Sequence, residues 1–166
     1  MSFDLFLLRF DNGKSAEVNR LPVLEVLKAT TYRGPDEYGF YVVAFPDGVH
    51  VEFSAGGLES QEKFDGCAFH IRGFGEGLLK FILDVARAGD MVIFPAMEGN
   101  PLILVSEQQK RNVPTDLLSK FQSVVVSTGD ELGAVLRGGF EGWSAYRDYV
   151  LEKSKKDSNC NEAKFD

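Results

Sequence analysis

The chain has 166 residues and a formal net charge of −7, with 44% of its residues hydrophobic and 26% charged. Such values are typical of one globular domain whose core needs neither disulfides nor a metal. The negative charge argues against a nucleic-acid partner and against an anionic membrane surface, because both would repel it.

The first residues predict a central strand. We also expect the protein to be cytoplasmic. These first residues carry Asp4 and lack a basic segment, so they do not resemble a signal peptide. No apolar run in the chain approaches the roughly 18 residues that span a bilayer. Within 2–10, apolar residues occupy both faces of an alternating pattern, which is typical of a strand in the middle of a sheet.

A short helix and a hairpin are expected next. Pro22 suits the first turn of a helix at 21–29, where its missing N–H group costs nothing. Strands at 38–45 and 49–54 flank Pro46-Asp47-Gly48, in which Pro presets φ and Gly takes a left-handed conformation. The segments predicted as polar loops on either side of the hairpin are 30–37 and 56–64.

The middle of the chain predicts a strand, an amphipathic helix and a second pair of strands. Residues 67–72 alternate between an apolar and a polar set. In 78–88, apolar residues recur at i, i+3, i+4 and i+7, which is a helical spacing, and Gly89 suits the C′ position after that helix. The short apolar strands predicted next are 91–94 and 102–105.

The last third predicts two helices separated by a glycine break. Thr128 followed by Glu131 is a capping box that starts a helix, and Gly138-Gly139 ends it. A final amphipathic helix covers 140–153, and the polar residues 154–166 are expected to form a disordered tail. The smaller elements predicted before these helices are a helix at 115–121 and a strand at 124–126.

The order of these elements indicates the fold class. Most neighbouring strands are joined by short connections rather than by a crossover helix. This favours an α+β fold with a mixed, mostly antiparallel sheet of about six to seven strands packed with helices. We expect residues 1–153 to form one such domain.

A glycine-rich turn, Gly73-Phe74-Gly75-Glu76-Gly77, lies between a predicted strand and a predicted helix, as a phosphate-binding loop would. Its GxGxG spacing differs from the GxGxxG of dinucleotide-binding folds, so we favour a turn that lets the helix approach the sheet. The cysteines and histidines show no metal-ligand spacing. We therefore expect no cofactor and no metal, and we interpret Cys67 as a small buried residue.

The histidines are the strongest catalytic candidates by residue type, because imidazole titrates near neutral pH. His50 and His70 occupy outward positions of two predicted strands, as do Glu52 and Arg72. If those strands are neighbours, the four side chains share a sheet face and supply a base, a carboxylate and a cation. The structural alternative, which we favour, is a solvated polar face with cross-strand pairs.

Acidic residues in predicted loops and aromatic residues in the final helix are candidates for binding another protein. Carboxylates suit a basic partner, because opposite charges speed association, and Trp and Tyr are common interface anchors. The alternative for the aromatic residues is packing on the sheet. The candidates are Asp36, Glu37, Glu59, Glu62, Glu98, Glu107, Trp143 and Tyr146.

Three segments carry a resemblance to known proteins. Met1-Ser2-Phe3-Asp4-Leu5, the apolar strand pair after the central helix, and Leu104-Val105-Ser106-Glu107-Gln108 running to Val113-Pro114 resemble a group of small uncharacterised bacterial proteins. In size, acidity and α+β composition the chain is also similar to immunity proteins that neutralise bacterial toxins, including those of contact-dependent inhibition systems. The resemblance implies binding to another protein and assigns no catalytic residue.

Three functional hypotheses follow from the sequence. The first is a non-enzymatic bacterial protein that binds a basic protein, such as an immunity protein that occludes the active site of a toxin domain. The alternative is a small enzyme of hydrolase or transferase type that uses His50, Glu52, His70 and Arg72. The third is an oligomer-forming module, for example a homodimer, that assembles through the last helix.

Overall fold

The computed structural model describes residues 2–97 and 99–162; for 139–147, 150, 154 and 157–162 it describes the backbone only. The fold is α+β, with nine strands among the described residues in one mixed, mostly antiparallel sheet. The strand order is β3-β4-β5-β6-β1-β7-β8-β9, with β2 paired to one end of β1. The strands are β1 (Phe3–Asp11), β2 (Lys14–Ala16), β3 (Thr31–Arg33), β4 (Phe40–Ala44), β5 (His50–Ser54), β6 (Gly66–Ile71), β7 (Val92–Pro95), β8 (Leu102–Leu104) and β9 (Ser123–Val125).

Strand β1 lies in the middle of the sheet, which confirms the prediction from its two apolar faces. It pairs antiparallel with β6 on one side and with β7 on the other. Leu5 and Leu7 are fully buried on one face, whereas Phe6 and Leu8 on the other face are 43% and 38% exposed. The two faces of the sheet therefore have different surroundings.

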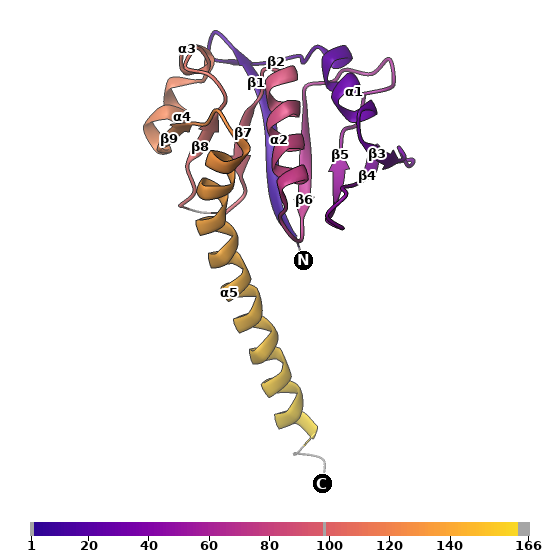
Figure 1. The fold of residues 1–166 in the computed structure, drawn as a ribbon. Helices are drawn as coiled ribbons and strands as arrows, with labels where there is room; N and C mark the ends of the chain where they lie inside the picture. The colour runs from indigo at the N-terminus through magenta and orange to yellow at the C-terminus, as the bar shows by residue number, and fades with distance from the viewer. Residues whose placement is uncertain (1, 98, 163–166) are drawn as a thin grey trace.

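Helices cover the face of the sheet that carries Leu5 and Leu7. They are α1 (Arg20–Lys28), α2 (Glu76–Ala88) and the first turns of α5 (Gly129–Glu162), and Figure 1 shows α2 lying across β1 and β6. Phe81 of α2 packs edge-on against Phe53 and Phe69, with ring centroids 5.6 and 5.7 Å apart. This aromatic cluster lies within the main core, in which Cys67 is also buried, as predicted.

Among the described residues, the opposite face is covered only at one end. There α3 (Gln109–Asn112) and α4 (Thr115–Lys120) lie over a smaller core that includes Phe10, Leu104 and Val113. Toward β5 and β6 this face is open, and Glu52 and His70 are partly exposed on it. The open part is the face on which the sequence places its candidate catalytic residues.

The hairpin of β4 and β5 and the helix α2 confirm the sequence predictions, whereas three short elements were not predicted. Strands β2 and β3 and helix α3 have only three or four residues, too few to show a hydrophobic period. The end of α2 also differs from the prediction. Gly89 has a φ of −94°, and Asp90 takes the left-handed conformation instead. A Cβ on Gly89 would lie 2.9 Å from Cγ1 of the buried Val18 and 3.2 Å from Cγ2 of the buried Val23, so a side chain here would require the core to shift.

Helix α5 runs unbroken from Gly129 to Glu162, which corrects the break predicted at Gly138-Gly139. A glycine costs a helix about 1 kcal/mol relative to alanine but removes no hydrogen bond, so good helix formers on either side keep the helix continuous. The helix also includes 154–162, where the sequence predicts a disordered tail; 163–166 lie outside the described residues. Figure 1 shows α5 extending away from the rest of the domain.

Candidate protein-binding site

Two loops meet at one end of the sheet and place four carboxylates around one hollow. The loop between β3 and β4 supplies Asp36 and Glu37, and the loop between β5 and β6 supplies Glu59 and Glu62. The hollow has a volume of about 310 Å³, and the exposed Tyr38 lies at its edge. No lysine, arginine or histidine of the described residues lines it. We call this the acidic hollow.

A close contact between glycines holds the two loops together. Gly39 has a φ of 81°, and a Cβ on it would lie 2.8 Å from the Cα of Gly56 in the other loop. The N–H group of Ala55 donates a hydrogen bond to the carbonyl oxygen of Gly39, with a distance of 3.0 Å. A side chain at position 39 would both strain the backbone and separate the loops.

Asp36 shapes the first loop with its own side chain. Its Oδ1 accepts hydrogen bonds from the backbone N–H groups of Tyr38 and Phe40, each at 2.9 Å. This is a local side-chain turn of the kind that aspartate favours. Glu37 and Tyr38, which follow Asp36, are exposed, and Tyr38 is 73% exposed. The loop thus presents a carboxylate and an aromatic ring on a fixed backbone.

Arg20, at the start of α1, holds the loop between β5 and β6 through its backbone. One guanidinium nitrogen of Arg20 donates to the carbonyl oxygen of Gly57 at 2.8 Å, and the same group donates to the carbonyl of Ser60. Leu58 and Phe64 anchor the loop in the core, since both are buried. The polar loop is therefore ordered by buried apolar residues and by a cation that bonds to its backbone.

Tyr41 connects the hollow to the core. The ring is buried in β4, and its hydroxyl donates a hydrogen bond to Oε2 of Glu59 at 2.6 Å. Burial raises the pKa of Tyr41 above its usual range, and the hydrogen bond and charge of Glu59 raise this pKa further. Tyr41 therefore keeps its proton and holds the Glu59 carboxylate in place.

The other predicted contact residues are not brought to this hollow. Glu107 lies after β8 and forms an ion pair with Lys110, with 3.0 Å between its Oε2 and the lysine Nζ. Glu98 lies outside the described residues, as do the side chains of Trp143 and Tyr146. Their proposed roles in binding remain predictions.

The histidine set is placed partly as the sequence hypothesis requires. Strands β5 and β6 are neighbours, and Glu52 lies directly opposite His70. Arg72 Nη2 lies 3.6 Å from Glu52 Oε1. His50 is exposed at the start of β5, opposite Ala44 of β4. Glu52 and His50 line two different hollows, and His70 and Arg72 line neither of them.

The nearest acid to His70 is a residue that the sequence analysis did not select. Asp4 of β1 lies opposite His70, and its Oδ1 is 2.9 Å from the histidine Nδ1. The Phe40 ring stacks on the imidazole, with centroids 5.7 Å apart. In a neutral imidazole this bond places the proton on Nδ1 and leaves Nε2 as the acceptor. The sequence indicates that Asp4 faces outward on a central strand. It does not indicate the strand register that places Asp4 opposite His70.

The glycine-rich turn before α2 lies directly against the β4–β5 hairpin. A Cβ on Gly75 would lie 2.2 Å from Oδ2 of Asp47, and one on Gly77 would lie 3.0 Å from the Phe45 ring. The glycines thus allow the start of α2 to contact the hairpin. The Asp47 carboxylate therefore lies beside this turn. Among the described residues there is no group of three or more side chains suited to hold a metal ion.

Comparisons with known proteins add no assignment. A scan against protein-family models and searches of curated proteins and of solved structures found no match to this chain. Within the described part of the chain, no helix combines the length and the apolar content that crossing a membrane requires.

Proposed function

We propose that this protein is a non-enzymatic bacterial protein that binds a basic protein partner through the acidic hollow. The single observation that supports the proposal is the meeting of Asp36, Glu37, Glu59 and Glu62 around one concave surface that no cation lines in the described part of the chain. Carboxylates around a surface that no cation lines attract a cationic partner and raise its association rate.

The structure of the two loops suits tight binding as well as attraction. The loops are held by the glycine contact, by Arg20 and by the Tyr41 hydrogen bond, so little ordering is needed when a partner docks. The exposed Tyr38 is of the residue type that most often anchors interfaces. Charge would steer the partner, and Tyr38 would contribute to its retention.

We further propose that the partner is a toxin domain with a basic active site, and that the protein is a cytoplasmic immunity protein that occludes this site. The support is the resemblance in size, acidity and α+β composition to immunity proteins. Such a protein needs no reaction of its own, only a surface whose charge complements the site that it covers.

Recovery of the partner tests the proposal. The immobilised protein is exposed to extract of its native cells at about 50 mM salt and then at about 500 mM salt, where exposed charges are screened. We expect a basic protein that is retained at the lower concentration and released at the higher one, and whose toxic activity is suppressed when the complex forms. If no basic protein is retained at low salt, the proposal is wrong.

One observation favours the enzyme hypothesis as a second candidate. The bond between Asp4 and His70 is the arrangement that orients a histidine base, with Glu52 and Arg72 beside it. This hypothesis predicts a hydrolase or transferase activity that disappears in His70→Ala. Equal rates of the wild-type protein and this variant on ester and phosphate substrates would remove the support for the enzyme hypothesis.

A further inference from the structure

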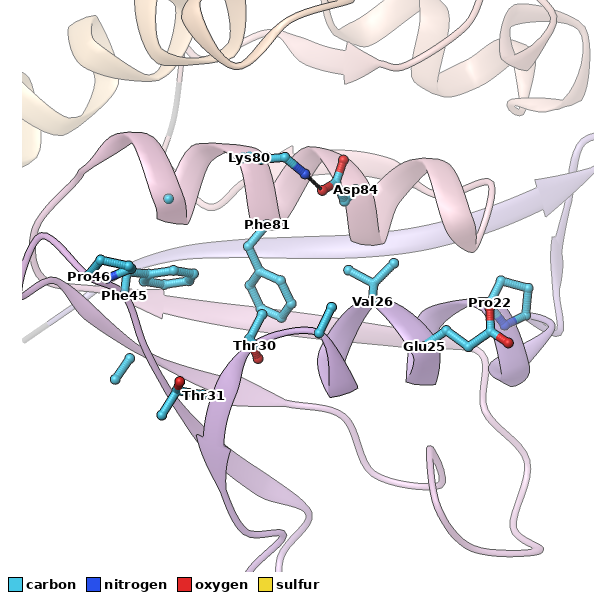
Figure 2. Close-up of a pocket in the computed structure, with 13 residues that line it drawn as sticks. Pro22, Glu25, Val26, Thr30, Thr31, Phe45, Pro46, Lys80, Phe81 and Asp84 are labelled. Carbon is cyan, nitrogen blue, oxygen red and sulfur yellow. Dashed lines mark hydrogen bonds and ion pairs between the residues drawn. The ribbon is translucent and has the colours of Figure 1, made fainter.

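A groove lies at the opposite end of β4 from the acidic hollow. It has a volume of about 550 Å³ and lies between α1, α2 and the tip of the β4–β5 hairpin. Figure 2 shows Val26 of α1, Phe81 of α2 and Phe45 of the hairpin converging on it. We call it the helix groove. Its volume is in the range of roughly 300–1,000 Å³ that is typical of ligand sites.

The floor of the helix groove is part of the rigid core. Phe81 is 3% exposed and belongs to the aromatic cluster with Phe53 and Phe69. Phe45 packs against Phe81, with ring centroids 5.8 Å apart. The groove stays open because α1 ends at Lys28 and the chain turns into β3 through Ala29 and Thr30. It is thus a preformed apolar surface.

The rim of the groove carries one uncompensated negative charge. Lys80 and Asp84 of α2 form an ion pair one helical turn apart, and Figure 2 shows them on the α2 side of the groove. Glu25 lies on the α1 side, and its carboxylate takes part in no hydrogen bond or ion pair within the described residues. Two carboxylates and one ammonium group leave a net charge of one negative unit.

We infer that the helix groove takes a lysine or arginine of the partner together with a neighbouring apolar side chain. The apolar floor suits the methylene stem of a long basic side chain, and the Glu25 carboxylate suits its charged head. The neighbouring apolar side chain would contact Phe45 and Phe81. The inference rests on the proposed function for the identity of the partner and adds a second contact site to it.

Both sites fit one partner. The acidic hollow is lined by Tyr41 near the start of β4, and the groove is lined by Ala44 near its end. A strand of five residues spans roughly 17 Å. An interface of ordinary size covers about 800 Å² on each partner, so a single basic domain can reach both.

A model peptide tests the groove without knowledge of the partner. The probe is a heptapeptide of alternating leucine and lysine, and binding is followed by NMR shifts of the Val26, Ala29 and Phe81 resonances. We expect these resonances to shift, and we expect no shift there with the same peptide carrying serine in place of leucine. An absence of groove shifts with the leucine–lysine peptide would overturn the inference.

Three variants separate the groove from general attraction to an acidic protein. Ala29→Leu fills the groove at an exposed position, and Ala134→Leu adds the same bulk on α5, away from the groove. We expect the dissociation constant at the groove to rise at least about fivefold in Ala29→Leu and in Glu25→Gln, and to stay unchanged in Ala134→Leu. Equal affinity in all four proteins would contradict the inference.

The two proposals fail in different ways. If a recovered basic partner binds Ala29→Leu as tightly as the parent protein, the groove inference is wrong while the proposed function stands. If the peptide binds the groove but no basic protein is retained from extract, the proposed function is wrong and the groove remains a binding site. Circular dichroism of each variant confirms that its fold is retained.

Discussion

At the scale of single residues, Tyr41 shows how the core of this protein positions a charge on its surface. Its ring belongs to the buried face of β4, and only its hydroxyl reaches Glu59. A buried neutral donor next to a carboxylate is stable as long as the tyrosine keeps its proton. The raised pKa of Tyr41 therefore links the stability of the domain to pH.

We predict that the free energy of unfolding falls at alkaline pH because of Tyr41. Below about pH 9 both the folded and the unfolded states hold its proton, so its contribution is complete. Above the ordinary tyrosine pKa of about 10 the unfolded state loses the proton and the folded state keeps it, which favours unfolding by up to about 1.4 kcal/mol per pH unit. Urea unfolding at pH 8 to 11 measures this slope.

The control for this prediction is Tyr41→Phe. At neutral pH it should lower the free energy of unfolding by about 1–2 kcal/mol, because the hydrogen bond to a charged group is lost. Between about pH 9 and 11 its stability should fall less steeply than that of the wild-type protein. Parallel pH profiles for the two proteins would contradict the role assigned to Tyr41.

Single-residue features could be predicted from the sequence where neighbouring residues determine them. They could not be predicted where they depend on a distant segment of the chain. The outward positions of His70, Glu52 and Arg72 follow from alternation along two strands. The bond from His70 to Asp4 joins positions 66 residues apart. It depends on the pairing of β1 with β6, which alternation does not specify. The acidic residues were likewise assigned to loops, but their meeting could not be derived.

At the scale of elements, the acidic hollow exists because two hairpin-side loops touch at Gly39 and Gly56. Gly39 combines a positive φ with a close approach of backbone to backbone. Gly48 in the β4–β5 turn has a positive φ of 88° but nothing within 4 Å of its missing Cβ. Gly39 and Gly48 thus share a positive φ, and of these two only Gly39 lies at a contact between loops.

We predict that Gly39→Ala destabilises the domain more than Gly48→Ala. Each substitution pays the cost of a left-handed alanine, about 1–2 kcal/mol, and Gly39→Ala also forces the loops apart. Thermal unfolding should show a melting temperature several degrees lower for Gly39→Ala than for Gly48→Ala. Equal melting temperatures would mean that the loop contact does not hold the hollow together.

The elements that sequence predicted best are those with a long period or a diagnostic turn. The helix α2 repeats its apolar residues over several turns, and Pro46-Asp47-Gly48 marks the hairpin. The continuity of α5 could not be inferred, because a glycine pair weakens a helix without forbidding it. The oligomer hypothesis, which depends on side chains of that helix, stays a prediction.

At the scale of the whole molecule, the sequence shows an acidic protein but not where its charge acts. The net charge of −7 is spread over the chain, whereas the structure gathers four carboxylates at one end of the sheet without a cation among the described residues that line the hollow. A local field of this kind speeds encounter with a basic surface more than the same charge dispersed. The arrangement, rather than the total charge, carries the proposed function.

The most direct test of the account is the association rate of the recovered basic partner with two charge-matched double variants. Glu37→Gln/Glu62→Gln removes two carboxylates from the acidic hollow, and Glu17→Gln/Asp116→Asn removes two exposed carboxylates elsewhere. In stopped-flow experiments at about 50 mM salt we predict a roughly tenfold slower association for the first variant and less than about a twofold change for the second. Equal rates for the two variants would contradict the assignment of the acidic hollow as the binding site.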